Sequence, residues 1–536
     1  MQSSNNSTPS TASSTNQAIQ FWLNGSVVSV NDAHPHQSLL QWLRQDPQRC
    51  GTKEGCAEGD CGACTVLMIE DLGDQQPLQV KPINSCIRLL PTLQGKAIVT
   101  VEGLSDINAP LHPAQQAMVD HHGSQCGFCT PGFVMSLAGL YKKQSSASRD
   151  DVCAAIAGNL CRCTGYKPIL DAAQQMMVIG RDDNSSAELR PQSRPAWQQW
   201  LQQIGQTDQH TGAAQVRAAL ASIPKTNPRY AWDGYTFLSP RSAAQVSQLL
   251  ADYPSAWILA GGTDVGLWIN KALQLNRTII WLGAAHDLNH IRTTDTHLEI
   301  GAAVATTQAF DALNKLYPKV ADIWLRFASI PVRNSATLCG NIANGSPIGD
   351  SMPVLISLGA TVQLDSVDGA RTIPLEDLYL EYKKQSRAPN EWVHSVHIPL
   401  PRADHIYAAY KLSKRPEQDI SAVLCAISMT QSAGVITSAR IAFGGMAGTP
   451  KRARAAEAAL LNQRFNKEAF EAAALALATD FTPLSDMRAT QMYRSKVAAN
   501  CLRRFWLENS LENSSAHRLK TSASQSVDHL AVRLVK

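Results

Sequence analysis

The sequence contains no stretch of about 18 or more consecutive apolar residues, so it offers no helix that could span a membrane. It also has no dense run of Lys and Arg interleaved with aromatic side chains, and its net charge is only +4 over 536 residues. Nucleic-acid binding is therefore not expected. Residues 1–17 lack a basic start and an apolar segment, which predicts a disordered leader and not a secretion signal.

What the sequence does have is cysteine, with 13 in a chain long enough for two to four domains. Without a secretion signal, this content favours reduced thiols and metal ligands over disulfides, and hence a cytoplasmic location. Eight of the cysteines form two quartets: Cys56, Cys61, Cys64 and Cys86, then Cys126, Cys129, Cys161 and Cys163. The other five are interpreted mostly as small core residues: Cys50, Cys153, Cys339, Cys425 and Cys501.

The first quartet follows C-x4-C-x2-C with a fourth cysteine downstream, which is the plant-type [2Fe–2S] spacing. Four thiolates must converge on a small volume, so the backbone has to wrap closely around the cluster. Four glycines supply that freedom: Gly51, Gly55, Gly59 and Gly62. The alternative metal is zinc, but zinc ribbons use paired C-x2-C knuckles that this spacing does not match. The spacing therefore predicts an iron–sulfur cluster.

The second quartet combines C-x-x-C with C-x-C, and each pair stands beside the predicted end of a helix. Thr130 is expected to cap the first helix, with Pro131 at its first position. Unpaired N–H groups at helix ends favour anionic thiolates. By spacing alone this quartet is also compatible with a redox dithiol or half a zinc site, although the single-residue gap between Cys161 and Cys163 suits zinc poorly. Two iron–sulfur sites in tandem would make a one-electron wire.

The hydrophobic pattern predicts an α+β chain of several domains, beginning with a small sheet over residues 18–104. Its first hairpin turns at Asn24-Gly25, a helix is expected over Ser38–Leu43 and a strand over Thr65–Ile69. Residues 105–180 change to helical period, which predicts four helices. They cover Ala114–Val119, Phe133–Leu140, Asp151–Ala157 and Pro168–Val178. Residues 181–229 are polar and rich in proline, so they are expected to form a linker that carries some helix.

Residues 230–400 mix strands with helices, and residues 401–508 place strands before helices. In the first of these regions Trp257–Ala260 and Thr278–Leu282 predict buried strands, and Thr306-Thr307 is expected to cap a helix that ends at Leu316. In the second, strands are expected over Ser421–Thr430 and Val435–Phe443, then helices over Arg452–Leu461, Lys467–Ala478 and Asp486–Trp506. Residues 509–536 are predicted to be a loose tail.

Three cysteine motifs, taken together and in this order, resemble the molybdenum hydroxylases, the family of xanthine dehydrogenases, aldehyde oxidases and carbon monoxide dehydrogenases. They are Gly55–Cys64, Cys126–Gly132 and Cys161–Tyr166, and the resemblance covers roughly residues 18–506. It implies a β-grasp plant-type ferredoxin domain, a helical [2Fe–2S] domain, an α/β FAD-binding domain and an α+β C-terminal subdomain. It also implies that all eight quartet cysteines are cluster ligands.

The resemblance extends to two flavin segments, Ile258–Val265 and Asn334–Asp350. Without it, a strand followed by Gly-Gly indicates an ordinary tight turn, Phe327 a core residue and Lys411 a solvated one. With it, these residues are expected to contact FAD: Ile258, Leu259, Ala260, Gly261, Gly262, Thr263, Asp264, Val265, Phe327, Thr337, Leu338, Cys339, Gly340, Asn341, Asp350 and Lys411. The sequence departs from the family pattern at Cys339, at Leu325-Arg326 and at Lys414–Glu417, near the expected nicotinamide position.

A molybdopterin-binding region would need several hundred further residues, and the 27 that follow Asn509 are too few, so a molybdopterin-binding large subunit is expected as partner. The arrangement resembles the small subunits of bacterial xanthine dehydrogenases, which implies a dimer of heterodimers. Electrons from hypoxanthine or xanthine would pass through both clusters to FAD and on to NAD+, and no side chain of this chain need act as an acid or base. Two alternatives are an aldehyde or N-heterocycle oxidoreductase subunit and a non-catalytic ferredoxin-like carrier. The sequence does not separate NAD+ from oxygen as acceptor.

Overall fold

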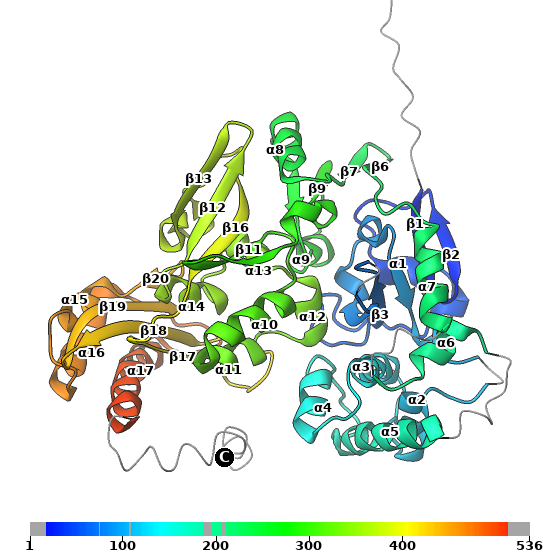
Figure 1. Cartoon of the computed structure of the whole chain (residues 1–536), viewed down its shortest axis with the longest axis horizontal. Helices are drawn as coiled ribbons and strands as arrows, with labels where there is room; N and C mark the ends of the chain where they lie inside the picture. The colour runs from blue at the N-terminus through cyan, green and yellow to red at the C-terminus, as the bar shows by residue number, and fades with distance from the viewer. Residues whose placement is uncertain (1–17, 74–75, 107–108, 186–193, 206–210, 513–536) are drawn as a thin grey trace, which may run out of the picture.

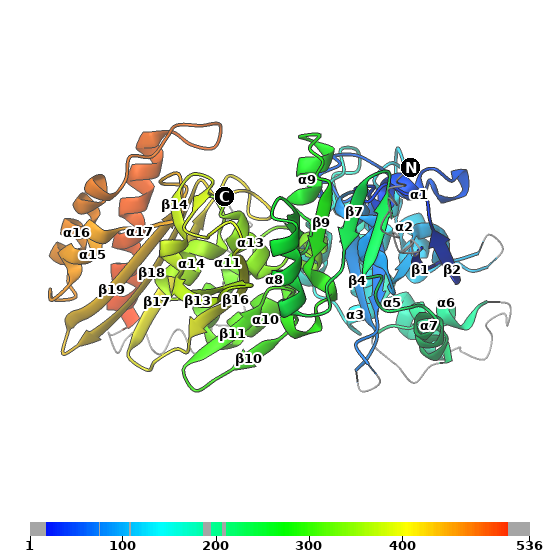
Figure 2. The same ribbon diagram turned by 90° about the horizontal axis from the view of Figure 1, so that it is seen from above.

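The computed structural model describes residues 18–73, 76–106, 109–185, 194–205 and 211–512. They form an α+β chain whose parts stand in a row: the N-terminal sheet and helices, then the middle of the chain, then the C-terminal strands and helices (Figures 1 and 2). The predicted leader, residues 1–17, and residues 513–536 of the predicted tail lie outside the described residues.

The N-terminal part is a five-stranded sheet of order β2-β1-β5-β3-β4, in which β1 and β5 run parallel. This is the β-grasp arrangement expected from the resemblance. The predicted hairpin is confirmed: Asn24 and Gly25 both have positive φ, 46° and 101°, as its tight turn requires. Ser38 caps the predicted helix through a capping box with Gln41. The elements are β1 (Ile19–Leu23), β2 (Ser26–Val30), α1 (Leu39–Leu43), β3 (Thr65–Glu70), β4 (Gln79–Asn84) and β5 (Ala97–Val99).

Four helices follow, as predicted: α2 (Pro113–Asp120), α3 (Thr130–Lys143), α4 (Arg149–Ile156) and α5 (Lys167–Ser185). The cap predicted at Thr130 is wrong, because the N-cap residue of α3 is Cys129. The Thr130 hydroxyl instead donates to Ser124 Oγ at 2.7 Å. Pro131 stands within the first turn, where its missing N–H costs nothing.

The predicted linker contributes two helices, α6 (Ala196–Leu201) and α7 (Thr211–Ala221), to the core of the N-terminal half. Trp197 packs edge-on against Trp22 of β1, with ring centroids 4.9 Å apart. Trp200 and Val216 are buried in the same core. The described part of this segment is therefore packed structure and not a bare connector.

The middle of the chain holds two large sheets, of order β6-β7-β9-β8 and β10-β11-β16-β12-β13, and the two-stranded sheet β14-β15, with one large apolar core among them. The predicted helix ending at Leu316 is confirmed, but Ala305 and not Thr306 is its N-cap, and no side chain bonds there. The elements are β6 (Arg229–Trp232), β7 (Tyr235–Leu238), α8 (Ala243–Asp252), β8 (Trp257–Leu259), α9 (Val265–Asn270), β9 (Thr278–Trp281), β10 (Ile291–Thr293), β11 (His297–Gly301), α10 (Thr306–Leu316), α11 (Ala321–Leu325), α12 (Ile330–Ser335), α13 (Leu338–Asn344), α14 (Ser351–Ser357), β12 (Thr361–Ser366), β13 (Gly369–Pro374), β14 (Tyr379–Glu381), β15 (Lys384–Gln385) and β16 (Trp392–Pro399).

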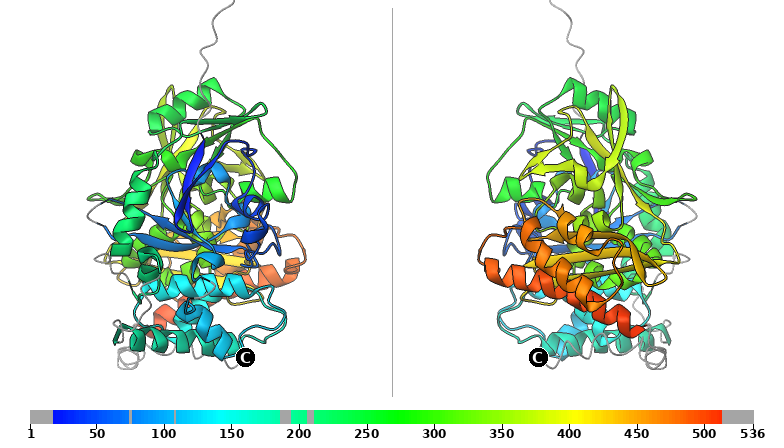
Figure 3. Two further views of the ribbon diagram at one scale, coloured as in Figure 1. Left: turned by 90° about the vertical axis from the view of Figure 1, so that its right-hand side faces the viewer. Right: turned by 90° about the vertical axis from the view of Figure 1, so that its left-hand side faces the viewer.

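The C-terminal part is a four-stranded antiparallel sheet with helices α15–α17 packed on it (Figure 3). Its elements are β17 (His405–Leu412), β18 (Val423–Ser432), β19 (Val435–Gly444), β20 (Lys451–Arg452), α15 (Arg454–Leu460), α16 (Lys467–Asp480) and α17 (Gln491–Glu512). Because α17 reaches Glu512, the first four residues of the predicted tail are helical. Among the helices of the described ranges, none has the length and apolar character needed to cross a lipid bilayer.

Candidate cofactor sites

The first cysteine quartet gathers at one end of the N-terminal sheet. Cys56, Cys61 and Cys64 lie on the loop that enters β3, and Cys86 lies on the 3-10 helix η2 (Ser85–Ile87) that leaves β4. Since β3 and β4 are antiparallel and pair Thr65 with Asn84, the two cysteine segments meet. Cys64 Sγ and Cys86 Sγ lie within hydrogen-bond distance, 3.3 Å apart, and the Cys56 sulfur accepts hydrogen bonds from the thiols of Cys61 and Cys86.

The loop also points backbone donors at the sulfurs. Cys56 Sγ accepts from the N–H groups of Glu58, Asp60 and Cys61 at 3.4, 3.3 and 3.3 Å. Hydrogen bonds from the Cys61 and Cys86 thiols, helped by those N–H groups, hold the pKa of Cys56 well below its usual range. The pKa of Cys86 rises in return, first because its thiol bonds Cys56 and Cys64. The site thus favours thiolate at part of the quartet before any metal is considered.

Two glycines show why this loop leaves room for a cluster. A Cβ at Gly55 would stand 2.8 Å from Cys61 Sγ, and Gly62 has φ +68° with the Asn159 amide and the Gly158 carbonyl against it. A larger residue at either position would displace a cysteine or its support. Four thiols, backbone donors and a side-chain-free cradle fit a thiolate-bound cluster.

The second quartet is built from helix ends. Cys129 is the N-cap residue of α3, and Cys161 and Cys163 lie between α4 and α5. Cys161 Sγ accepts from the N–H groups of Cys163 and Thr164, both at 3.4 Å, and from Thr164 Oγ1 at 3.2 Å. Cys129 pairs with Cys161, and Cys126 pairs with Cys163, through thiol hydrogen bonds. Cys161 is buried whereas Cys126 and Cys163 are exposed, so one side of this site is open.

The two cysteine sites adjoin each other. The Leu160 N–H donates to the Cys61 carbonyl at 3.0 Å, and the Asn159 side-chain amide donates to the Gly62 carbonyl at 3.1 Å. Outside the two quartets, the described residues contain no group of three or more His, Cys, Asp or Glu side chains arranged to hold a metal ion. Of the five remaining cysteines, Cys339, Cys425 and Cys501 are buried as predicted, but Cys153 is exposed and Cys50 only partly buried.

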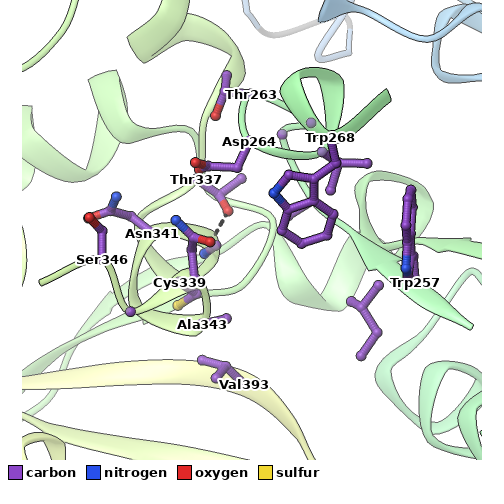
Figure 4. Close-up of a pocket in the computed structure, with 18 of the residues that line it drawn as sticks. Trp257, Thr263, Asp264, Trp268, Thr337, Cys339, Asn341, Ala343, Ser346 and Val393 are labelled. Atoms are coloured by element: carbon purple, nitrogen blue, oxygen red, sulfur yellow. Dashed lines mark hydrogen bonds between the residues drawn. The ribbon is translucent and has the colours of Figure 1, made fainter. Parts of the chain in front are cut away.

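A cavity of about 1,100 Å³ opens between the first cysteine loop and the middle of the chain. Figure 4 shows that its wall carries aromatic rings as well as hydroxyl and amide groups, among them Trp268, Thr337 and Asn341. Its volume and mixed wall suit a large ligand with ring systems and polar links. Twelve of the predicted flavin residues line it: Ile258, Ala260, Gly261, Gly262, Thr263, Asp264, Val265, Phe327, Thr337, Cys339, Gly340 and Asn341.

Two close backbone approaches shape this cavity. A Cβ at Gly261 would stand 2.0 Å from the Ser335 carbonyl oxygen, and Gly262 has φ +80°. The first predicted flavin segment can therefore lie directly on the second. Thr337 caps α13 by accepting from the Gly340 N–H at 3.0 Å. Asp264 also lines the cavity, and burial raises the pKa of its carboxyl. The residues present fit a dinucleotide such as FAD.

Four predicted flavin residues do not line the cavity: Leu259, Leu338, Asp350 and Lys411. Lys411 Nζ lies 2.5 Å from Asp350 Oδ2, and both side chains are buried. Ser421 donates to the other carboxylate oxygen, and Lys411 also donates to the Arg326 carbonyl. The pair joins β17 to the start of α14, behind the cavity wall. Its predicted contact with FAD stays a prediction.

Sequence reasoning missed several residues of the cavity wall. Trp257 and Trp268 pack edge-on, with ring centroids 5.4 Å apart. Tyr379 and Gln385 brace α13 and the residues beside it by donating to the carbonyls of Ile342 and Ala343 at 2.9 and 2.8 Å. Trp257 could have been found from its place just before the first flavin segment. Tyr379 and Gln385 are about 40 residues away from the segment they support, and no local pattern indicates them.

Much of the chain matches known protein domains. Three family descriptions match the chain: "[2Fe-2S] binding domain" over residues 100–174, "FAD binding domain in molybdopterin dehydrogenase" over residues 233–401 and "CO dehydrogenase flavoprotein C-terminal domain" over residues 408–509. The xanthine dehydrogenase of Emericella nidulans is 31% identical over 504 residues, 86% of this chain and 36% of that protein. Aldehyde oxidase 1 of Rattus norvegicus is 29% identical over 85% of this chain and 36% of that protein.

Among solved structures, a chain of reconstituted CO dehydrogenase from Oligotropha carboxidovorans is 30% identical. The match covers 50% of this chain and 94% of that chain, with a TM-score of 0.47. Two cysteine sites beside a dinucleotide-sized cavity define an iron–sulfur flavoprotein. The chain belongs to the molybdenum hydroxylase family, of which it carries the iron–sulfur and flavin domains. It spans a little over a third of the length of the curated relatives it matches.

Proposed function

We propose that this chain is the electron-transfer subunit of a molybdenum hydroxylase of the xanthine dehydrogenase type. A molybdopterin-binding partner would oxidise hypoxanthine or xanthine, and the electrons would pass through the two [2Fe–2S] clusters to FAD and then to NAD+. The flavin is needed because the clusters carry single electrons and NAD+ takes a pair. The role of this chain is to hold the three cofactors close together.

The observation that carries the proposal is the shared wall of the first cysteine site and the cavity. Glu58 and Ile87, which stand two residues after Cys56 and one residue after Cys86, both line the cavity. The second site reaches the first through the Leu160–Cys61 backbone hydrogen bond. The open side of the second site, at Cys126 and Cys163, leaves a face for the partner subunit. A chain that only carried electrons singly would not need the cavity.

The test is anaerobic titration of the purified chain with NADH, followed by visible absorbance. We expect flavin absorbance near 450 nm beside iron–sulfur absorbance, and bleaching of both by NADH, because hydride transfer is reversible. Absence of flavin would contradict the proposal and favour the ferredoxin-like carrier. Flavin that NADH does not bleach would exclude NAD+ as the acceptor.

The choice of purine is tested on the complex that co-purifies with the chain. Turnover of hypoxanthine or xanthine is expected, together with a large subunit that contains molybdopterin. Turnover of aldehydes or N-heterocycles alone would support the alternative reading, for which the likeness to a rat aldehyde oxidase is one reason. Mass measurement of the complex tests the expected dimer of heterodimers.

A further inference from the structure

The short helix α9 connects the cavity to the first cysteine quartet. It begins directly after the Gly261–Asp264 turn, and Val265, Leu267 and Trp268 all line the cavity. Its last residue, Asn270, lies on the other side, against the cysteine loop. Contacts that hold α9 against that loop therefore also set the position of the cavity wall relative to the quartet.

Asn270 makes that connection with a single amide group. Its Nδ2 donates to the Cys86 carbonyl at 2.8 Å and to the Ala57 carbonyl at 3.0 Å. Ala57 directly follows Cys56 and has φ +57°, a conformation in which a residue with a Cβ is strained. The three-cysteine loop and the segment of the fourth cysteine are thus tied to each other through one side chain from the flavin domain.

The rest of α9 packs too tightly on the quartet for Asn270 to be an incidental contact. A Cβ at Gly266 would stand 2.7 Å from the Ile87 Cβ. Ile87 follows Cys86, so the helix rests on the residue next to a predicted ligand. Lys271 adds only a long, half-exposed ion pair with Glu58, at 3.8 Å, which contributes little. The Asn270 amide donates to both cysteine segments, whereas Lys271 contacts only one of them.

We propose that Asn270 is a positioning residue for the first iron–sulfur cluster. Through the Ala57 and Cys86 carbonyls it sets the separation of the two ligand segments and their distance from the flavin cavity. The proposal rests on the proposed function, because it needs a cluster at Cys56, Cys61, Cys64 and Cys86. It adds a residue outside both cysteine segments, on the flavin side, that controls the properties of the cluster.

The principal variant is Asn270→Leu, which keeps the shape of the side chain and removes both hydrogen bonds. Electron paramagnetic resonance of the reduced chain reports the two clusters separately, and a redox titration gives their potentials. We expect the potential and line shape of the first cluster to change and its rate of reduction by NADH to fall about tenfold or more, since small misplacements are costly. The signal of the second cluster serves as an internal reference and should not change.

Asn270→Ser is a milder variant, in case Asn270→Leu fails to assemble. Its short hydroxyl can reach at most one of the two carbonyls. It should change the first cluster in the same direction but less. Asn276→Leu is the matched control. It also removes two side-chain hydrogen bonds, from Nδ2 to the Ser255 carbonyl at 2.9 Å and from the Thr278 N–H to Oδ1 at 3.0 Å, and it should leave both signals unchanged.

The outcomes separate the two proposals. If the unchanged protein shows no first-cluster signal, the proposed function fails. If it shows that signal and Asn270→Leu leaves the signal, its potential and its reduction rate as they were, the role of Asn270 fails. If Asn270→Leu loses both clusters and the flavin together while Asn270→Ser matches the unchanged protein, Asn270 serves only folding and the proposal is overturned.

Discussion

At the scale of single residues, the largest effect on stability is expected where a buried charge has a single partner of opposite charge. Lys411→Met would leave the Asp350 carboxylate without its partner at 2.5 Å, in a site where both side chains are buried. Removing one member of such a pair costs about 3–5 kcal/mol of the free energy of unfolding. Guanidinium chloride unfolding, followed by tryptophan fluorescence, measures this loss.

Two control variants test whether the loss of stability comes from leaving a buried charge unpaired. The double variant Asp350→Leu, Lys411→Met removes both charges and should regain much of the lost stability. Arg402→Ala breaks a pair whose side chains are 72% and 42% exposed, so it should change the free energy of unfolding by at most about 1 kcal/mol. Equal losses of unfolding free energy in Lys411→Met and Arg402→Ala would show that the buried pair contributes no more to stability than the exposed pair.

At the scale of elements, helix α2 is capped by a histidine, and protonation of that histidine would break the capping hydrogen bond. His112 Nδ1 accepts from the Ala114 N–H at 3.1 Å. Burial lowers the pKa of His112 from 6.5 to about 4, and the Leu201 carbonyl opposes this while Arg194 and Lys142 add to it. Between those pH values His112 is protonated in the unfolded chain but remains neutral in the folded chain. The free energy of unfolding should therefore fall, by up to about 3 kcal/mol, as the pH drops from about 6.5 to about 4.

His112→Asn keeps a capping side chain and removes the titration, so its unfolding free energy should depend less on pH over this range. The exposed His286 provides the control His286→Asn, which should keep the pH dependence of the unchanged chain. Denaturant unfolding at several pH values gives the comparison. An identical pH dependence for His112→Asn and the unchanged chain would contradict the assignment.

The two flavin segments can meet only because one position in the first has no side chain. Gly261→Ala would place a methyl group 2.0 Å from the Ser335 carbonyl oxygen, so the segments must separate. We expect the variant to purify with less than about a tenth of the normal bound flavin, since each 1.4 kcal/mol of misfit costs a factor of ten in affinity. Absorbance near 450 nm per chain measures this.

Gly448→Ala is the matched control, because its methyl group would meet its nearest atom, the Tyr382 Cβ, at an ordinary 3.6 Å. It should bind flavin normally. Full flavin content in Gly261→Ala would mean that the contact between the segments does not shape the site.

The sequence predicts an element well when the residues that determine it are close together in the chain, and poorly when they are far apart. The Asn24-Gly25 hairpin and the helices α2–α5 follow from local turn and periodicity rules and were predicted. The packing of α6 is not predicted, because it depends on the contact of Trp197 with Trp22, which stands 175 residues earlier. The cysteine quartets can be identified because their ligands are close in sequence. The bond from Asn270 to Cys86 spans 184 residues and has no local signal.

At the scale of the whole molecule, the three candidate sites follow one another in space in a different order from the sequence. The second quartet touches the first through Leu160 and Cys61, and the first touches the cavity through Ile87. The sequence runs first quartet, second quartet, cavity. The first quartet, which comes first in the chain, therefore contacts both other sites, and Gly158 beside the second quartet packs on Ser329, the neighbour of Ala328 in the cavity wall.

This order predicts that the two quartets respond differently when each is disabled. In Cys126→Ser, NADH should still bleach the flavin and reduce the first cluster, because nothing between them has changed. In Cys64→Ser, NADH should bleach the flavin but leave the second cluster oxidised, because the first site has lost a buried cysteine. Paramagnetic resonance after NADH addition distinguishes the two variants. Reduction of the second cluster at the normal rate in Cys64→Ser would show that electrons do not pass through the sites in series, and survival of both signals unchanged would show that Cys64 is not a ligand.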